Sequence, residues 1–316
     1  MKKALVAGGA GFIGSHLCER LVKDGWQVFC IDNLITGSLK NVEHLKVNEN
    51  FFFIDCDVTR PLPEEIIEEK FDIVLHLASP ASPQDYMRRP LETILANTQG
   101  TQNLLNLCKK TGASFLFAST SEVYGDPQVH PQPENYWGNV NPIGPRSCYD
   151  ESKRLGETFT MLYHRNDDVN TRIVRIFNTY GPKMQRGDGR AIPTFISQAL
   201  SGEDITVYGD GSQTRSFCYV ADLVEGIIKV ATLPDTNGKV INLGNTEEFT
   251  IAELAQLIKK EIGSRSRLVY KPLPEDDPTR RRPDISLARK LLGWEPKVSF
   301  EEGLVQTIEY FKTLRQ

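Results

Sequence analysis

The segment GGAGFIG at residues 8–14 most constrains the fold, because it joins an apolar run at residues 4–7 to an amphipathic pattern that starts at residue 15. Gly8, Gly11 and Gly14 recur at a spacing of three. Glycines here permit a tight turn and let backbone N–H groups approach a phosphate at a helix N-terminus. A glycine-rich turn alone is weak evidence, since such turns also serve as plain structure. With a strand before it and a helix after it, the segment predicts the first βαβ unit of a nucleotide-binding fold.

An acidic residue supports this prediction. Asp32 ends the second apolar run, 18 residues after Gly14. A carboxylate there can accept hydrogen bonds from both ribose hydroxyls and would repel a 2′-phosphate, so NAD is favoured over NADP. Asp57 ends the third run and could meet the adenine amino group, although helix capping or a turn explains it equally well. We predict that the following residues contact NAD: Gly8, Gly11, Phe12, Ile13, Gly14, Asp32, Asn33, Thr36, Gly37, Asp57, Val58, Leu77, Ala78, Ser79, Asn97, Tyr149 and Lys153.

Short apolar runs alternate with amphipathic segments over the first half of the chain. This alternation predicts an α/β fold with a doubly wound parallel sheet, the Rossmann arrangement, covered by helices on both faces. The expected strands are residues 4–7, 28–31, 51–54, 73–77, 115–118 and 172–177. The expected helices are residues 15–23, 91–110 and 149–165.

The texture changes after Tyr180-Gly181-Pro182, where glycine, proline and short elements dominate. We therefore expect an NAD-binding Rossmann domain over residues 1–180 and a smaller C-terminal α/β substrate domain over residues 181–316. The boundary is soft, because residues 240–245 could return to the first sheet. Helices are expected at residues 192–200, 221–232, 251–262 and 301–313.

The charge pattern argues against several partners. The net charge is −4 and no block of five like charges occurs, so we expect no nucleic-acid surface and no membrane patch. The nearest to a basic cluster, residues 280–282, follows three acids and reads on charge alone as a solvated loop. The six cysteines are scattered without a C-x-x-C pair, so we expect no metal site, no disulfide framework and a reducing, cytoplasmic setting.

A candidate for acid–base chemistry combines a strand end with a helix. Tyr149 and Lys153 are four residues apart, which places them on one helical face. A tyrosine is a poor base at pH 7, but a nearby ammonium should stabilise the phenolate and lower its pKa. Thr120 lies two residues after the apolar run at residues 115–118, where the strand is expected to end. Its hydroxyl can hydrogen-bond an alcohol and the phenol. A lone Y-x-x-x-K is weak evidence, yet here it follows an NAD fingerprint. The three groups together predict proton removal from an alcohol as hydride leaves.

Together, GGAGFIG at residues 8–14, Thr120, Tyr149 and Lys153 resemble the signature of the extended short-chain dehydrogenase/reductases, which act on nucleotide sugars. Longer segments resemble the branch of this family that decarboxylates UDP-glucuronate, and the resemblance covers nearly the whole chain. These segments are ASPASP at 78–83, STSEVYGDP at 119–127, NPIGPRSCYDE at 141–151, RIFNTYGP at 175–182, GSQTR at 211–215 and GWEP at 293–296.

The resemblance implies a reaction with no net redox change. Tyr149 would take the proton of the sugar 4-hydroxyl while hydride moves from C4 to NAD⁺. The 4-keto sugar acid would lose CO₂ through an enolate, and return of the hydride would give UDP-xylose. The resemblance also implies a homodimer formed through the helices near residues 91–110 and 149–165.

The middle residue of Thr120-Ser121-Glu122 distinguishes branches of the family. In the related 4,6-dehydratases the strand ends Thr-Asp-Glu, and the Asp expels the C6 hydroxyl. Ser121 is a weak acid that can hydrogen-bond a substrate carboxylate, whereas an Asp would repel it. Glu122 is expected to position a water or assist at C5. Both Ser121 and Glu122 could instead cap the next turn.

A substrate carboxylate calls for an arginine, because a guanidinium can bind it through two hydrogen bonds. By resemblance this arginine is Arg281, with Arg282 as a near alternative. Arg190, Arg215 and Asn178 match positions near the nucleotide diphosphate. Tyr208 is expected in the uracil pocket, and Tyr86 either touches the sugar or packs as an aromatic.

Two other functions remain open. One is a nucleotide-sugar 4-epimerase or 4,6-dehydratase on the same fold, which would not need the carboxylate-binding arginine or would need an acid in place of Ser121. The other is a catalytically inactive NAD-binding module. The intact set of Thr120, Tyr149 and Lys153 argues against that module, because a protein without catalysis has no use for it.

Overall fold

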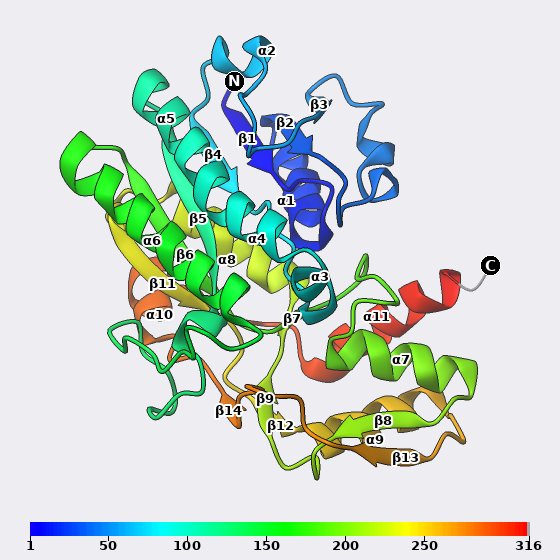
Figure 1. Ribbon diagram of the computed structural model, residues 1–316. Helices are drawn as coiled ribbons and strands as arrows, with labels where there is room; N and C mark the ends of the chain where they lie inside the picture. Colours follow the sequence, from blue (N-terminus) through cyan, green and yellow to red (C-terminus); the bar gives the residue numbers. More distant parts are fainter. Residues whose placement is uncertain (315–316) are drawn as a thin grey trace.

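A seven-stranded parallel sheet forms the centre of the computed structural model, which describes residues 1–314 (Figure 1). The strand order is β11-β6-β5-β4-β1-β2-β3, and every neighbouring pair is parallel. This confirms the α/β doubly wound sheet predicted from the alternating pattern. The strands are β1 (Lys3–Ala7), β2 (Gln27–Asp32), β3 (Phe51–Asp55), β4 (Ile73–His76), β5 (Ser114–Thr120), β6 (Thr171–Ile176) and β11 (Lys239–Leu243).

Alternate residues of each strand enter different cores, which is why the strands are apolar throughout. On β1, Val6 belongs to one buried cluster, while Leu5 and Ala7 belong to the cluster on the other face. The first face is covered by α1 (Phe12–Lys23) and α8 (Val220–Thr232). The second face is covered by α4 (Pro90–Leu95), α5 (Thr101–Thr111) and α6 (Ser147–Asp167), which run side by side in Figure 1.

A smaller group of elements lies at the bottom of Figure 1. It contains three of the four C-terminal helices expected from the sequence: α7 (Ala191–Ser201), α9 (Ile251–Ile262) and α11 (Phe300–Thr313). Short strands pair beside them. These are β8 (Ile205–Tyr208) with β13 (Leu268–Lys271), and β9 (Thr214–Ser216) with β12 (Glu248–Thr250) and β14 (Arg280–Arg281).

The chain crosses between these two groups more than once. β11 pairs with β6, so residues 239–243 do return to the first sheet, as the sequence analysis allowed. α8 also packs against α1. The domain boundary at residue 180 therefore stays a prediction, because the chain passes between the two groups of elements more than once.

The structure contains several short elements that the sequence did not predict. The expected helix at residues 91–110 is interrupted by a π-helical turn, η3 (Ala96–Gly100). Other elements not foreseen are the short strands β8, β9, β12, β13 and β14 described above, and α2 (Glu64–Ile67), α3 (Pro83–Arg88), α10 (Ser286–Leu292), β7 (Thr179–Tyr180), β10 (Cys218–Tyr219), η1 (Leu39–Asn41), η2 (Glu43–Leu45), η4 (Ser121–Tyr124) and η5 (Pro234–Thr236).

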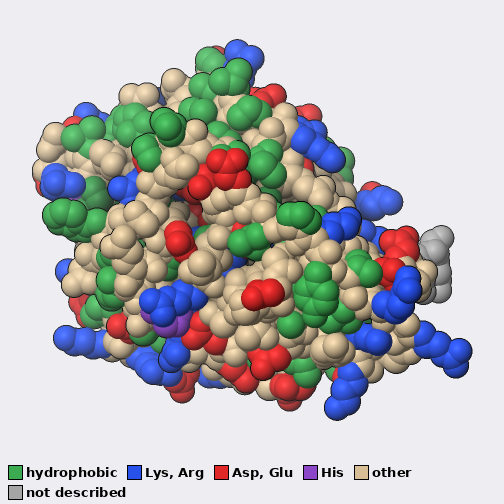
Figure 2. Space-filling view, turned by 60° about the horizontal axis from the view of Figure 1, so that its bottom comes forward, with side chains coloured by type: hydrophobic (Ala, Val, Ile, Leu, Met, Phe, Trp, Pro, Cys, Tyr) green, Lys and Arg blue, Asp and Glu red, His purple; other side chains and the backbone are tan. Residues whose placement is uncertain are grey.

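Acidic and basic side chains are interspersed over the face shown in Figure 2. Within residues 1–314, no helix is both long and apolar enough to cross a membrane. No group of three or more side chains in that range is arranged to hold a metal ion.

Candidate active site

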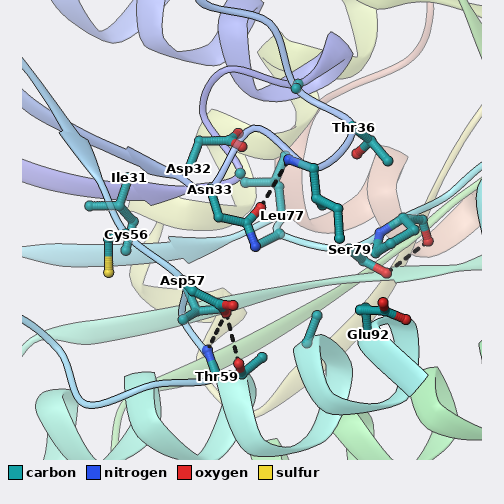
Figure 3. A pocket seen from close by; sticks show the side chains of 18 of the residues that line it. Ile31, Asp32, Asn33, Thr36, Cys56, Asp57, Thr59, Leu77, Ser79 and Glu92 are labelled. Atoms are coloured by element: carbon teal, nitrogen blue, oxygen red, sulfur yellow. Dashed lines mark hydrogen bonds between the residues drawn. The ribbon is translucent and has the colours of Figure 1, made fainter. Parts of the chain in front are cut away.

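A cavity of about 170 Å³ opens at the carboxyl ends of β1, β2, β3 and β4. Figure 3 shows side chains from several of these strand ends around it. Open α/β sheets bind their ligands at this edge. The cavity is lined by these residues predicted to contact NAD: Gly8, Gly11, Asp32, Asn33, Thr36, Gly37, Asp57, Val58, Leu77, Ala78 and Ser79.

Two glycines allow the backbone to pack closely beside this cavity. A Cβ on Gly8 would lie 2.6 Å from the Ala78 nitrogen, and its φ of +80° also disfavours a side chain. A Cβ on Gly14 would lie 2.1 Å from the Gly8 carbonyl oxygen. The glycines therefore hold the turn against the strand ends and leave its surface bare for a phosphate. This arrangement fits the dinucleotide predicted from the sequence.

Asp32 stands at the edge of the cavity with its carboxylate fixed by the backbone. Its Oδ2 accepts a hydrogen bond from Ala10 N at 3.0 Å, and its Oδ1 accepts one from Leu34 N at 2.8 Å. Burial raises the pKa of Asp32, and the two backbone donors oppose that shift. Each carboxylate oxygen has a second lone-pair direction, so the group can still accept from ribose hydroxyls. A Cβ on Gly37 would lie 2.8 Å from Oδ1, so this glycine leaves room for the carboxylate.

Asp57 makes a turn, which was one of the two roles that the sequence left open, and its contact with adenine stays a prediction. Its Oδ1 accepts hydrogen bonds from Thr59 N at 2.9 Å and Thr59 Oγ1 at 2.8 Å, which is a turn. The residue also lines the cavity. Other predicted cofactor residues lie off the cavity wall. Asn97 is buried in η3 and donates to Ser152 Oγ at 3.0 Å, while Phe12, Ile13 and Gly14 form the first turn of α1.

The three predicted redox residues come together where β5 ends beside α6. Thr120 is the last residue of β5, and Tyr149 and Lys153 occupy one face of the first turns of α6. All three side chains are buried. The Lys153 Nζ donates to the Ala118 carbonyl oxygen at 2.8 Å and lies 5.8 Å from the centre of the Tyr149 ring.

The ionisation of this group differs from the expectation. Burial raises the pKa of Tyr149, and the hydrogen bond to Thr120 and the charge of Arg190 do not overcome it. Burial lowers the pKa of Lys153 to about 7, although Glu157 opposes this shift. The predicted lowering of the tyrosine pKa by Lys153 is therefore wrong for this arrangement. The physical reason is that burial removes water and so disfavours the charged form of each residue, the phenolate of Tyr149 and the ammonium of Lys153.

Tyr86 lies against Tyr149. The two rings stack with centroids 4.9 Å apart and planes 7° from parallel. Tyr86 is buried, and its hydroxyl has no hydrogen-bond partner among residues 1–314. The packing role that the sequence allowed is present, and the free hydroxyl leaves a polar group beside the base.

Glu122 lies between two arginines. Its Oε2 accepts from Arg146 Nη2 at 2.6 Å, and its Oε1 accepts from Arg281 Nη1. Burial favours the neutral acid, yet the two guanidinium groups lower the pKa of Glu122 to about 2. Glu122 is therefore a carboxylate near neutral pH and cannot hold a proton for C5, although it can still orient a water.

Thr120 caps the turn after β5, instead of Ser121 or Glu122, the two residues expected as alternatives. Thr120 Oγ1 accepts from the Glu122 backbone N–H at 3.2 Å and caps η4. Ser121 follows in η4 and is buried. Arg281 reaches this turn from β14 and donates to the Gly125 carbonyl oxygen at 3.0 Å. The turn therefore presents Ser121 and Glu122 beside a buried guanidinium.

Arg190, Arg215 and Tyr208 come from the smaller group of elements, whereas Asn178 follows a strand of the central sheet. Arg190 precedes α7 and pairs with Asp188, and Arg215 on β9 pairs with Asp277 at 3.1 Å. Tyr208, at the end of β8, is 44% exposed. It lines neither the cavity at the glycine turn nor a second cavity beside Glu122. Asn178 follows β6, and its carbonyl oxygen accepts from Cys218 N at 2.9 Å.

Three charged residues of the site escaped the sequence analysis. Arg146 sits immediately before α6, Asp150 lies in its first turn, and Asp277 belongs to the loop before β14. Arg146 and Asp150 share a second cavity, of about 190 Å³, with Glu122. Arg146 and Asp150 could have been predicted from their position in the sequence, since both lie close to Tyr149. No sequence pattern pointed to Asp277, because the residues that pair with its side chain lie at least 62 positions away.

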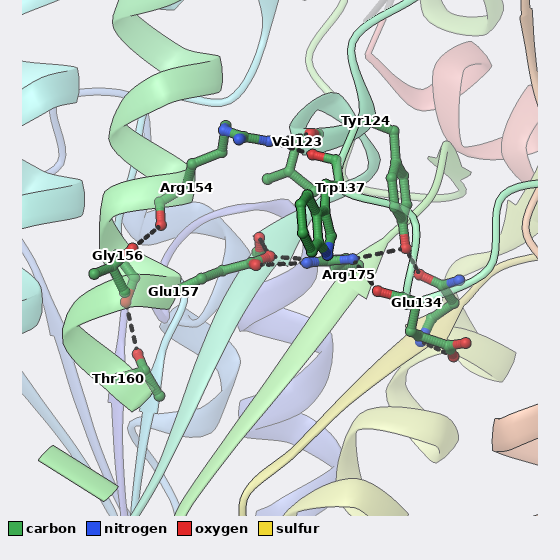
Figure 4. A network of polar contacts seen from close by, with 12 residues as sticks. Val123, Tyr124, Glu134, Trp137, Arg154, Gly156, Glu157, Thr160 and Arg175 are labelled. Atoms are coloured by element: carbon green, nitrogen blue, oxygen red, sulfur yellow. Dashed lines mark hydrogen bonds and ion pairs between the residues drawn. The ribbon is translucent and has the colours of Figure 1, made fainter. Parts of the chain in front are cut away.

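A polar framework fixes the end of β5 from behind. Glu157 on α6 accepts from Ser119 Oγ at 2.6 Å and from Arg175 on β6 at 2.9 and 2.7 Å. Arg175 also donates to the Tyr124 hydroxyl at 2.9 Å, and Figure 4 shows these side chains side by side. The residues before and after Thr120-Ser121-Glu122 are thereby tied to α6 and β6.

The chain is similar to proteins of known activity. It is 55% identical over 311 residues to UDP-glucuronic acid decarboxylase 1 of Danio rerio, covering 98% of this chain and 72% of that protein. It is 51% identical over 310 residues to UDP-glucuronic acid decarboxylase 2 of Arabidopsis thaliana, covering 98% and 68%. The crystal structure of UDP-glucuronic acid 4-epimerase from Bacillus cereus, in complex with UDP-glucuronic acid and NAD, superposes with a TM-score of 0.90 at 31% identity, covering 99% of each chain.

The model of one protein family, the NAD dependent epimerase/dehydratase family, matches residues 4–244. That range begins in β1 and ends just after β11, so it spans the entire central sheet, the NAD cavity, and Thr120, Tyr149 and Lys153. Sheet order, glycine turn and redox residues agree with the resemblance drawn from the motifs, and the chain belongs to the NAD dependent epimerase/dehydratase family.

Proposed function

We propose that this protein decarboxylates UDP-glucuronate to UDP-xylose with NAD as a bound cofactor that is regenerated in each cycle. The names of its relatives at 50–55% identity support this substrate and reaction. The family and the lined cavity at the glycine turn support NAD. When bound there, NAD supplies a reversible hydride acceptor for C4 of the sugar.

The chain's own residues supply the proton transfers and the positioning. Tyr149 takes the proton of the sugar 4-hydroxyl, and Thr120 hydrogen-bonds that oxygen and the phenol. Oxidation at C4 places a ketone β to the C6 carboxylate, so loss of CO₂ leaves its electron pair in an enolate. A water held by the Glu122 carboxylate can then give a proton to C5, and the hydroxide left behind takes up from solvent the one proton that the overall decarboxylation consumes. Burial lowers the pKa of Lys153 to about 7, so its amine can lose its proton near neutral pH. A negative charge that forms on Tyr149 or beside the cofactor would raise this pKa and favour the ammonium form.

One observation carries the assignment to a sugar acid. Three arginines, Arg146, Arg215 and Arg281, share two carboxylates, Glu122 and Asp277, at the end of β5. Asp150 lies in the same cavity as Arg146 and Glu122, and burial raises its pKa to about 7, so the cluster keeps an excess of positive charge next to the redox residues while Asp150 is protonated. A buried guanidinium without full compensation is costly, so an anionic group on the substrate would relieve it. Ser121 adds no competing charge there.

Product analysis tests the proposal. The purified protein is incubated with UDP-glucuronate and NAD, and CO₂ and the nucleotide sugars are followed. We expect CO₂ and UDP-xylose in equal amounts, with no accumulation of reduced cofactor. Conversion of UDP-glucuronate without release of CO₂ would contradict a decarboxylase.

A 4-epimerase acting on the same sugar acid is the second candidate. The observation in its favour is the fold match to the Bacillus cereus epimerase, which was crystallised with UDP-glucuronic acid. An epimerase must let the 4-keto sugar turn over and present its other face, while keeping the carboxylate. The same incubation separates the two, because an epimerase would yield UDP-galacturonate and no CO₂.

We also propose that the protein is a homodimer and works in the cytoplasm. Support for the dimer comes from a set of exposed apolar side chains on the neighbouring helices α4 and α6: Leu91, Leu95, Leu155 and Leu162, which are 44–69% exposed. Support for a reducing, cytoplasmic setting comes from the six free cysteines.

A further inference from the structure

Both arginines assigned to the nucleotide diphosphate are held by aspartates of this same chain. Arg190 donates from Nε and Nη2 to the two oxygens of Asp188, each at 2.5 Å. Arg215 donates from Nη2 to Asp277 Oδ2 at 3.1 Å. A guanidinium binds a carboxylate and a phosphate through the same N–H donors. Each aspartate therefore occupies donors that a phosphate would need.

One member of each pair is largely shielded from solvent. The Asp188 side chain is 7% exposed against 32% for Arg190, and the Arg215 side chain is 10% exposed against 24% for Asp277. Charges shielded in this way interact more strongly than a surface ion pair. The aspartates are thus effective competitors for these arginines.

The charges of the two pairs match those of the ligand. Two aspartates carry two negative charges, and the diphosphate of a nucleotide sugar also carries about two at neutral pH. Both aspartates lie on loops, Asp188 between β7 and α7 and Asp277 between β13 and β14. A loop can release its acid without breaking a strand or helix.

We propose that Asp188 and Asp277 are internal stand-ins for the diphosphate, which hold Arg190 and Arg215 until a nucleotide displaces them and which recapture them as it leaves. This inference rests on the proposed function, because it assigns these arginines to the diphosphate. It gives the two aspartates a definite effect: they weaken nucleotide binding and speed release of the nucleotide product.

The size of the effect follows from the time each arginine spends on its aspartate. An arginine that is free for a third to a tenth of the time weakens apparent binding by about threefold to tenfold. Removing the negative charge of the aspartate should restore this affinity.

Calorimetric titration of the NAD-loaded protein with UDP tests the inference. D188N and D277N are each expected to lower the Kd for UDP by about threefold to tenfold. E275Q is the charge-matched control, since Glu275 is an exposed acid on the same loop as Asp277, and it should leave the Kd unchanged. A Kd that is unchanged or raised in both aspartate variants would overturn the inference.

Two further arms separate displacement of a specific acid from a general change of charge. Uridine lacks the phosphates, so neither variant should bind it more tightly; an equal gain for uridine would overturn the inference. Asp277 also lies 3.6 Å from Arg146, so the second arm uses the other pair: in an R190A background, D188N should no longer improve UDP binding, and a persisting gain would also overturn the inference. If the unsubstituted protein binds no UDP, the proposed function itself fails, which is distinct from these outcomes.

Discussion

Tyr149 lies buried between Tyr86 and the end of β5, and its proton is held more tightly than in water. Lys153, four residues on, has a pKa lowered to about 7 by the same burial. Transfer of the Tyr149 proton to Lys153 is unfavourable on these shifts alone, because the pKa of the phenol lies well above that of the amine, so the charges of bound substrate and cofactor have to favour it. Burial thus prepares this pair to respond to a charge that arrives with the ligands.

Y149F tests the role of the phenol. Without a hydroxyl to take the proton, turnover of UDP-glucuronate should fall by about 10²- to 10⁴-fold, while NAD remains bound. Steady-state rates measure turnover, and an assay of the NAD released from the denatured protein measures cofactor content. Y163F is the matched control on the same helix, where the lost hydroxyl contacts only Asn106 among the described residues, and it should keep its rate. Retention of most activity by Y149F would remove Tyr149 as the base.

Asp150 predicts a pH dependence of stability. Burial, the negative charge of Glu122 and that of Glu151 raise the pKa of Asp150 to about 7, against Arg146 and Arg281. Between about pH 4 and pH 7 the unfolded chain has lost a proton that the folded protein keeps, so this residue destabilises the fold as the pH rises. D150N removes that term. Its free energy of unfolding should gain about 1–3 kcal/mol on the wild type between pH 5 and pH 8.

Urea unfolding at the two pH values provides the measurement for Asp150. E203Q, at an exposed acid that is not among the charges acting on Asp150, is the control and should follow the wild type. A difference between D150N and the wild type that does not change with pH would mean that Asp150 is already ionised in the folded protein.

At this scale the sequence predicted groups with a local motif and missed groups that act at a distance. Gly8, Asp32 and Tyr149 each follow from a short pattern, and the structure brings them to the expected places. The partners of Glu122 lie 24 and 159 residues away. No periodicity links such positions, so the ion pair that makes Glu122 a permanent carboxylate required the folded chain.

Among the elements, α6 is positioned by a close approach to β5. Gly156 on α6 faces Phe117 on β5, and a Cβ at residue 156 would lie 2.3 Å from the Phe117 ring. The glycine therefore lets the helix that carries Tyr149 and Lys153 lie near the strand that carries Thr120. The distance between these reactive groups depends on a residue that touches neither substrate nor cofactor.

G156A tests this contact. Alanine normally stabilises a helix by about 1 kcal/mol relative to glycine. Here the new methyl group must displace a buried ring, so we expect a net loss of about 1–3 kcal/mol in the free energy of unfolding. G187A is the control, because a Cβ there meets no atom within 4 Å. Thermal denaturation compares the two, and a G156A protein more stable than the wild type would show that α6 can shift without cost.

The long helix over residues 91–110 shows how far periodicity reaches. The apolar spacing correctly predicted helical structure there, but not the π-helical turn at Ala96–Gly100. Such a turn inserts one residue and is stabilised by its surroundings. Gly100 packs against Val58, and Asn97 bonds Ser152 on α6. These partners lie in other elements, so a local pattern could not reveal the turn.

For the whole molecule, the exposed apolar side chains of α4 and α6 predict self-association. Leu155 and Leu162 are seven residues apart and lie on one face of α6. The double variant L155E/L162E would place two charges in the proposed interface. We expect the wild type to sediment as a dimer and this variant as a monomer. V305E, which changes an equally exposed side chain on α11, should remain dimeric. A monomeric wild type would contradict the proposal.

The overall architecture was largely predictable, because alternating strands and helices leave few arrangements. The strand order was less so. β4 lies between β1 and β5, and β11 joins β6 from 63 residues further along the chain, since β6 ends at Ile176 and β11 begins at Lys239. Pairings over such distances depend on which edge remains open after earlier strands have paired.

The return of β11 also sets an order of events during synthesis. β6 leaves the ribosome first, and its outer edge has no partner until residues 239–243 have emerged. Throughout translation of residues 177–238 the nascent chain therefore carries an unpaired, apolar strand edge, the kind of surface that invites pairing with other chains. We therefore expect this protein to depend more on chaperones during that interval than one whose sheet closes in the order in which it is made, which refolding yields with and without a chaperone would measure.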